Sequence, residues 1–376
     1  MLILQIIGGL LILVALVVLH ELGHAIVARR NGVVVEEFGI GFPPKAWGKK
    51  LKNGVLFTLN WLPLGGFVKL QGEHDASSKK GDYGAATLWQ KTKILFAGVA
   101  INWLTAVVLL TILAWTGMPQ VLANQFSIPS DTRVNSQPVE IVELLKDYPA
   151  EQAGFETGDK ILTFDGQKLD SSQALVEAAQ EQRGETINVT VERDGKELTK
   201  EVTLRDNETG SVFGASLGQR QTTQATWSAP IVGVVTTGQF TWATLEGLGQ
   251  LFANLASGIA LQFNPDTRDQ ANDHLQQAGD SVAGPVGILG TIFPAAEQAG
   301  LTQLVLLTAI ISLTLAVMNA LPIPALDGGR WFVTVVFRLL KKPLTKEREE
   351  NIQATGFLVL MGLIVIITIA DVVKLF

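Results

Sequence analysis

The chain has 376 residues, of which 47% are hydrophobic and 17% charged, with a formal net charge of −6 at pH 7. Its apolar residues gather in long blocks, which is typical of an integral membrane protein with a soluble insert and not of a soluble multidomain protein. The acidic balance argues against nucleic acid as a partner. The absence of cysteine excludes a disulfide framework and a thiolate nucleophile or metal ligand.

Four apolar segments are long enough to cross a lipid bilayer, which requires about 20 helical residues each. They cover residues 2–28, 94–116, 301–324 and 355–374. The connections 29–93 and 325–354 are rich in Lys and Arg and are therefore predicted to lie in the cytoplasm. The stretch 117–300, which is rich in Asp and Glu, is then expected outside the cell, together with both chain termini.

The first apolar segment contains the sequence His20-Glu21-Leu22-Gly23-His24 near its cytoplasmic end. On a helix, His20 and His24 lie on one face. Two imidazoles at this spacing can hold one zinc ion, with Glu21 beside them to take a proton. Because each ionisable residue in a membrane-spanning helix costs roughly 2.5–3.5 kcal/mol, three of them within five positions favour a functional site over a polar helix end.

The basic loop after this helix contains apolar, glycine-rich sequence. Residues 37–42 and 55–61 favour short strands, and residues 62–68 continue with proline and glycine turn residues. Such a hairpin could enter the membrane from the cytoplasmic side, where irregular backbone survives only against protein or a water-filled cavity. A hairpin on the protein surface is the alternative.

Residues 135–206 are predicted to form a compact α+β domain outside the membrane. The Asp194-Gly195 pair predicts a tight turn between two strands. The segment Pro149–Phe155, followed by Gly158-Asp159-Lys160-Ile161, resembles a PDZ domain, which binds an extended peptide at a sheet edge. The alternative is a small domain that acts only as a spacer.

Residues 226–263 are apolar but interrupted by polar residues, and we expect a pair of amphipathic helices on the outer membrane surface. A fifth span here would invert the segment that follows. Residues 264–282 are polar and are expected to form a flexible connection.

A catalytic zinc site usually has three protein ligands, so the two histidines need a partner. His74 lies in a polar loop, and His274 is expected across the membrane from the motif. Asp327 is better placed, because the predicted topology brings it to the membrane depth of His20 and His24. An aspartate that merely ends a helix is the alternative.

The sequence around Asp327 favours a carboxylate that points back into the helix bundle. Pro322 and Pro324 interrupt the preceding helix. Gly328 and Gly329 allow a tight turn beside the aspartate.

Residues 20–24 and the run Asn319–Gly328 together resemble the site-2 protease family of intramembrane zinc proteases, in particular the bacterial branch typified by the regulator of sigma-E protease. Phe38–Phe42 and Pro63–Lys69 resemble the membrane-reentrant β-loop of that branch. Gly284–Ile288 resembles a motif before its third core helix. The best-known members carry two tandem PDZ domains, whereas this chain has room for one.

The resemblance implies a zinc endopeptidase of the bacterial inner (plasma) membrane that cleaves the transmembrane segments of single-pass membrane proteins in regulated intramembrane proteolysis. Its substrates would be anti-sigma factors or remnant signal peptides. The expected parts are residues 1–116 with the first two spans, the PDZ-like domain 135–206, the peripheral helices 226–263, and residues 284–376 with the last two spans. The expected roles are Zn²⁺ ligands for His20, His24 and Asp327, a catalytic base for Glu21, and substrate binding for Asn319, Gly65 and Gly66.

Two other classes of function use the same residues. A membrane metal transporter or sensor would need ligands that continue across the membrane, and the four spans offer almost none beyond Glu21 and Asp327. A non-catalytic PDZ scaffold with a structural metal would have no need of a base at position 21.

Overall fold

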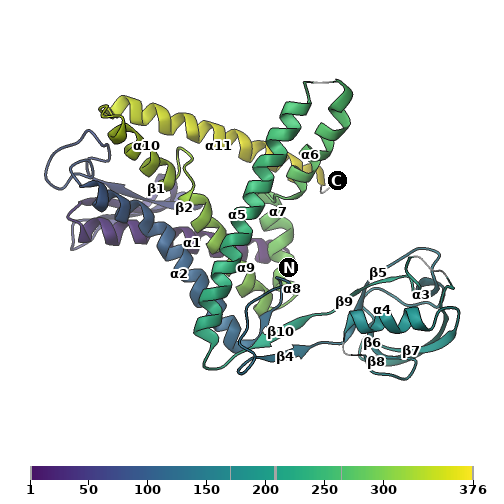
Figure 1. Ribbon diagram of the computed structural model, residues 1–376. Helices are drawn as coiled ribbons and strands as arrows, with labels where there is room; N and C mark the ends of the chain where they lie inside the picture. Colours follow the sequence, from purple (N-terminus) through teal and green to yellow (C-terminus); the bar gives the residue numbers. More distant parts are fainter. Residues whose placement is uncertain (1, 170, 207–209, 264, 375–376) are drawn as a thin grey trace. The chain divides into compact units, whose positions relative to one another are not determined.

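The computed structural model describes residues 2–169, 171–206, 210–263 and 265–374 (Figure 1). Met1, Asp170, Asn264 and residues 207–209 and 375–376, which fall within predicted ranges, lie outside these described residues. The chain divides into two compact units. We call residues 1–113 with 230–376 the membrane unit and residues 114–229 the insert, and we describe each by itself.

Four helices in the described residues are long and apolar enough to cross a membrane, which confirms the four predicted spans. They are α1 (Leu2–Arg30), α2 (Leu88–Thr116), α9 (Leu301–Ala320) and α11 (Lys346–Lys374). Many large apolar side chains on α1 and α11 are exposed, for example Ile3 at 73% and Leu358 at 70%. Exposed apolar surface of this kind is stable in lipid and costly in water.

Local sequence signals set the helix ends. A capping box begins α2 six residues before the predicted start: the Thr87 backbone N–H donates to Oε1 of Gln90, and the Gln90 N–H donates to the Thr87 hydroxyl. Helix α9 ends at Ala320 because Pro322 cannot donate a backbone hydrogen bond.

The first basic loop forms a β-sheet from two long strands, β1 (Val35–Lys50) and β2 (Leu56–Leu70), which we call the hairpin sheet. Residues 37–40 of β1 pair with two stretches of β2, residues 56–59 and residues 66–69. Residues 45–50 pair with residues 56–60. The sequence predicted short strands here, but each strand doubles back, so the sheet is wider than a simple hairpin.

The segment between the insert and α9 differs from the prediction. Where the sequence suggested a pair of helices, α5 (Ala229–Leu261) is one helix of 33 residues. Thr237, Thr241 and Thr244 lie within this helix, and each donates its hydroxyl to a carbonyl one turn earlier, which satisfies the hydroxyl without a partner outside the helix. The second helix is α6 (Arg268–Asp280), which lies where a flexible connection was expected.

Short helical elements complete the membrane unit. They are η1 (Pro265–Thr267), α7 (Pro285–Gly287), η2 (Ile288–Ile292), α8 (Phe293–Gln298) and α10 (Asp327–Leu339). Asp371 on α11 is buried and accepts hydrogen bonds from the N–H groups of Gly284 and Gly287. This contact attaches the start of α7 to the last span.

The insert contains a five-stranded antiparallel sheet with the order β8-β7-β6-β5-β9 and two helices, the α+β content of the predicted PDZ-like domain. The elements are β5 (Val139–Leu144), α3 (Pro149–Gln152), β6 (Lys160–Phe164), α4 (Ser172–Glu181), β7 (Thr186–Arg193), β8 (Lys196–Thr203) and β9 (Ala215–Gly218). Strand β9 extends the domain beyond residue 206. Ile187, Val189 and Val191 alternate into its core.

Two short strands, β4 (Arg133–Ser136) before the domain and β10 (Gln221–Gln224) after it, connect this domain to the rest of the insert. Strand β10 pairs with β4 on one side and with β3 (Met118–Pro119) on the other. Asp131 accepts hydrogen bonds from the N–H groups of Thr226 and Ser228 and from both hydroxyls. Burial alone would raise the pKa of Asp131, but these hydrogen bonds outweigh it and hold the pKa well below its usual range.

Candidate metal centre

The metal centre is built where α1 and α2 touch through glycines. A Cβ atom on Gly23 of α1 would lie 2.7 Å from the carbonyl oxygen of Ala97 on α2. A Cβ on Gly98 of α2 would lie 2.6 Å from Nε2 of both His20 and His24. Small residues allow membrane helices to approach this closely, and the missing Cβ of Gly98 leaves the space in front of the two imidazoles open.

Each histidine has a neighbour at the ring nitrogen that faces away from the centre. Nδ1 of His24 donates to the carbonyl of Ile94 at 2.8 Å, which leaves Nε2 as the ligand atom. Nδ2 of the Asn102 carboxamide lies 3.4 Å from Nδ1 of His20. Oδ1 of Asn102 is buried and has no hydrogen-bond partner among the described residues. Turned toward His20, this oxygen would accept the Nδ1 proton and direct Nε2 of His20 to the same centre.

Asp327 is held by a rigid turn between α9 and α10. Ala325 has a positive φ of 78°, and its N–H donates to Oε1 of Gln353 on α11. Gly328 and Gly329 pack so closely on the carbonyls of Ala320 and Ile323 that no Cβ would fit at either position. The sequence therefore fixes the backbone on both sides of Asp327.

The three predicted ligands come together, as the sequence analysis expected. Oδ2 of Asp327 lies 3.0 Å from Nε2 of His20 and 3.2 Å from Nε2 of His24. One ligand atom from each residue lies within 4.8 Å of the others, and these three form the one metal-binding cluster found among the described residues.

This donor set fits zinc. Tetrahedral zinc with bonds of about 2.0–2.1 Å places two ligand atoms about 3.3 Å apart, close to the distances between Asp327 and the imidazoles. Two neutral imidazoles and one carboxylate leave a fourth position for water, and the negative charge of Asp327 would be compensated by the ion.

Glu21 lies between the two histidines in sequence and faces the hairpin sheet. A Cβ on Gly66 of β2 would lie 3.7 Å from Cγ of Glu21 and 3.8 Å from Cγ2 of Val18. Gly65 has a φ of 87°, which favours glycine, and approaches Val17 and Phe42 in the same way. The stretch of β2 that includes these glycines therefore passes directly over the part of α1 that contains Val17, Val18 and Glu21.

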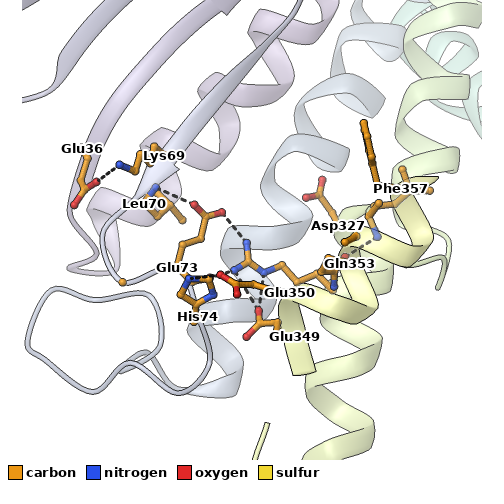
Figure 2. A pocket seen from close by; sticks show the side chains of 15 residues that line it. Glu36, Lys69, Leu70, Glu73, His74, Asp327, Glu349, Glu350, Gln353 and Phe357 are labelled. Atoms are coloured by element: carbon orange, nitrogen blue, oxygen red, sulfur yellow. Dashed lines mark hydrogen bonds and ion pairs between the residues drawn. The ribbon is translucent and has the colours of Figure 1, made fainter. Parts of the chain in front are cut away.

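Asp327 also borders a cavity of about 740 Å³ between the hairpin sheet, α10 and α11. Figure 2 shows the ion pairs that line it. Arg330, one turn after Asp327, donates to Oε1 of Glu73 at 2.7 Å and lies 3.4 Å from Glu349 of α11. Its guanidinium is centred 4.7 Å from the ring of Tyr83. These contacts attach α10 to the loop between β2 and α2 and to α11.

The other histidines are outside the metal centre. Nε2 of His74 lies 3.6 Å from Oε1 of Glu350, on the wall of the cavity. Nδ1 of His274 lies 3.1 Å from Oδ1 of Asn254. Asn319, which the family resemblance assigns to substrate binding, donates from Nδ2 to the carbonyl of Leu315 on its own helix.

Sequence reasoning missed Gly98 and Asn102, which both belong to α2. They are four residues apart, so they lie on one face of the helix, and that face meets the face of α1 with His20 and His24. A glycine and an asparagine at this spacing within a membrane span were the available signal. Gln353 was also missed, because no local pattern relates it to Ala325.

Comparison with known protein families identifies the chain. The model of "Peptidase family M50" matches residues 8–363. The chain belongs to peptidase family M50, the site-2 protease family. It is a multi-pass zinc metalloprotease of the membrane, which confirms the expected family, enzyme class and cofactor and decides against a metal transporter or sensor and a non-catalytic scaffold.

Relatives of this M50 protease match over almost their whole length. A protein of Clostridium perfringens is 32% identical over 371 residues, with 98% of each chain covered. The "Zinc metalloprotease RasP" of Geobacillus kaustophilus is 28% identical, with 99% of this chain and 98% of the relative covered. The "Regulator of sigma-W protease RasP" of Bacillus subtilis is 26% identical, with 99% of each chain covered.

A solved PDZ domain of an SdrC-like protein from Listeria monocytogenes is also similar to part of the chain. It covers 21% of this chain and 86% of its own, with 23% identity and a TM-score of 0.20.

Proposed function

We propose that this M50 protease cleaves peptide bonds within the transmembrane segments of single-pass membrane proteins, at the centre formed by His20, His24 and Asp327. The observation that carries the proposal is the convergence of one ligand atom from each of these three residues within 4.8 Å. His20 and His24 flank Glu21 on α1, a helix long and apolar enough to cross a membrane.

Each residue has a role that follows from its chemistry. His20, His24 and Asp327 would hold Zn²⁺, which polarises the scissile carbonyl and acidifies an attacking water. Glu21 accepts the proton of that water and returns it to the amine that leaves. Asn102 fixes the ring of His20, and the carbonyl of Ile94 fixes the ring of His24. Asn319 contacts the substrate backbone near the centre.

The hairpin sheet supplies the place where the substrate is held. A membrane-spanning helix has its carbonyls occupied in hydrogen bonds, so a substrate must unwind locally before it can be cut. Residues 66–69 of β2 pair with residues 37–40 of β1. Gly66, in the same stretch, lies against Glu21. An unwound substrate segment would add to the hairpin sheet as an extra strand, with Gly65 and Gly66 giving its backbone room to approach.

The surface of the hairpin sheet fits a position within or at the membrane on the cytoplasmic side. Trp61 is 71% exposed and Leu62 is 49% exposed. Tryptophan at such positions favours the membrane interface. The basic loops that contain Lys49, Lys50 and Arg348 would lie in the cytoplasm and the insert outside, in the plasma membrane of a bacterium.

The proposed substrates are membrane proteins whose outer part has already been removed, of the anti-sigma factor or remnant signal peptide type. The name of the Bacillus subtilis relative describes it as a regulator of a sigma factor, which supports the first type. The insert would act on such substrates from outside, by size exclusion or by binding a newly exposed chain end.

Co-expression with single-pass substrates tests the reaction. Glu21→Gln should abolish cleavage and retain zinc, because the amide has the same shape but cannot accept the proton. Glu297→Gln, an exposed residue of α8, is the control and should cleave normally. Full cleavage by Glu21→Gln would overturn the assignment of the base.

Single cysteines in this cysteine-free chain test the orientation. We expect Lys52→Cys and Arg348→Cys to be labelled only from the cytoplasm and Lys196→Cys only from outside. The three positions are exposed. Labelling of Lys196→Cys from the cytoplasm alone would reverse the proposed topology.

A further inference from the structure

The hairpin sheet contains an unusual stretch of positive charge. Residues 38–72 include five lysines and no aspartate or glutamate, in a chain whose net charge is −6. Lys45, Lys49 and Lys50 lie on one exposed stretch of β1. The ion pairs among the described residues do not include these lysines or Arg29, one of the two basic residues in the last turn of α1. This charge is therefore available to a partner.

An apolar pocket of about 280 Å³ lies between the last two turns of α1 and the hairpin sheet, and we call it the hairpin pocket. Leu22 and Ile26 line it from α1, and Phe38 and Phe57 line it from the sheet. Arg29 is the charged residue in its lining. Leu22 and Ile26 are 39% and 38% exposed on a membrane-spanning helix, so the pocket opens on the side of α1 that meets lipid.

Strand geometry places Lys49 beside this pocket. Lys49 is the cross-strand partner of Phe57, and side chains of paired residues project from the same face of a sheet. Trp47 lies on that face as well, with its ring centroid 6.3 Å from that of Phe57. Lys50 is the next residue along the strand and projects from the opposite face.

We propose that the hairpin pocket binds an anionic phospholipid, with one acyl chain in the pocket and the phosphate held by Arg29 and Lys49. The apolar lining suits a hydrocarbon chain, and the two cations at its rim suit a phosphate whose headgroup adds no compensating positive charge. Trp47 suits the level of the headgroups. A zwitterionic lipid would bring an ammonium group toward the same cations, which opposes binding.

The bound lipid would connect α1 to the hairpin sheet. One part of that sheet lines the pocket, and another part passes Glu21 through Gly66. The proposal concerns lipid binding and does not depend on the proposed reaction.

Photo-crosslinking tests the proposal on the purified full chain in detergent. The probes are phosphatidylglycerol and phosphatidylcholine with the same diazirine-bearing acyl chain, and the labelled peptides are mapped by mass spectrometry. We expect phosphatidylglycerol to label residues 22–29 and 51–57 several-fold more than phosphatidylcholine does. Equal labelling by both lipids, or labelling only elsewhere on the chain, would overturn the proposal.

Paired variants separate a built site from general surface charge. Arg29→Gln and Lys49→Gln should each reduce labelling about five-fold, because a basic residue near an anionic lipid contributes about 1 kcal/mol. Arg30→Gln and Lys50→Gln, which change neighbouring charges away from the pocket, should leave labelling unchanged. An equal loss in both pairs would show diffuse attraction and contradict the site.

Two further variants keep the result interpretable if a substitution disturbs folding. Arg29→Lys retains the charge and should retain labelling. Ile26→Trp retains every charge, fills the pocket from the exposed side and should lower labelling. Zinc content reports whether each variant is folded. A folded, zinc-loaded Ile26→Trp protein with normal labelling would exclude the pocket as the acyl-chain site.

Discussion

Oδ2 of Asp327 lies 3.0 Å from Nε2 of His20, although the two residues are 307 positions apart in the sequence. His20 belongs to the first span, and Asp327 begins the helix that follows the third. The turn at Ala325 lies two residues before Asp327, and Gly23 brings the helix of His20 into close contact with α2. The distances between these side chains therefore depend on how the helices of the membrane unit pack, as well as on the chemistry of the side chains.

Loss of any one ligand should remove the metal. His20→Ala, His24→Ala and Asp327→Asn should each lower activity by at least about 100-fold and weaken zinc retention, because two ligands hold zinc poorly. The measurement is zinc content after dialysis against a chelator, with cleavage of a single-pass substrate. If Asp327→Asn kept wild-type zinc and turnover, the third ligand would be another residue, with His74 the first to examine.

Asn102 should act on zinc through His20. Asn102→Leu removes the partner of Nδ1 and should weaken zinc binding by about 10–100-fold. Asn102→Asp supplies an oxygen that accepts the same proton and should restore much of the affinity. Competition with a coloured chelator measures both. Equal zinc affinity in the wild type and both variants would show that Asn102 of α2 only fills space against α1 and α9.

The insert should select substrates without taking part in hydrolysis. Ser136 of β4 pairs with Gln221 of β10. Residues 137–220 can therefore be replaced by a short Asn-Gly turn that joins these two paired strands as a hairpin. The deletion protein should cleave a pre-shortened substrate as the wild type does and should also admit its full-length form. Unchanged discrimination would defeat the filter, whereas loss of all cleavage in a zinc-loaded protein would indicate a positioning role.

Asp159 should stabilise the insert in a pH-dependent way. It is buried and accepts from Nε of Arg193 at 2.6 Å, from Nη2 at 2.7 Å, and from the N–H of Glu156 at 2.9 Å. Burial raises its pKa, but the hydrogen bonds and charge of Arg193 outweigh burial, so the pKa is lowered in the folded state. The stabilisation is therefore present above the unfolded pKa of about 3.9 and is lost as the pH falls through the folded value.

Asp159→Asn should destabilise the insert by roughly 1–3 kcal/mol at pH 7, the cost of an imperfectly paired buried group. Hydrogen exchange of insert peptides in the full chain measures this, and the difference from wild type should shrink below about pH 4. Glu192→Gln removes an exposed ion pair with Lys160 and should change little. A destabilisation by Asp159→Asn that is equal at all pH values would contradict the linkage.

The sequence predicted the parts of the fold that local patterns determine. Apolar length predicted the four spans, and the spacing of His20 and His24 with the turn residues around Asp327 predicted the three side chains that the structure brings together. The continuous α5 could not be predicted in this way, because glycine and threonine lower helix propensity and only the fold shows that the threonine hydroxyls are satisfied within the helix. Gly98 and Gln353 act through packing between helices, which no single segment encodes.

The glycine contact between α1 and α2 also bears on how the protease responds to bilayer thickness. Membranes of different thickness tilt or shift helices to reduce hydrophobic mismatch. With no Cβ at Gly23 or Gly98, the two helices are already in backbone contact beside His20 and His24, so this contact resists a relative tilt of α1 and α2 there. The apolar window of α11 has no buried residues, so this stretch can bend in response to mismatch although Gln353 and Asp371 attach the helix near its two ends. Mismatch should therefore be absorbed at the periphery, and the spacing of the zinc ligands should stay constant between thin and thick membranes.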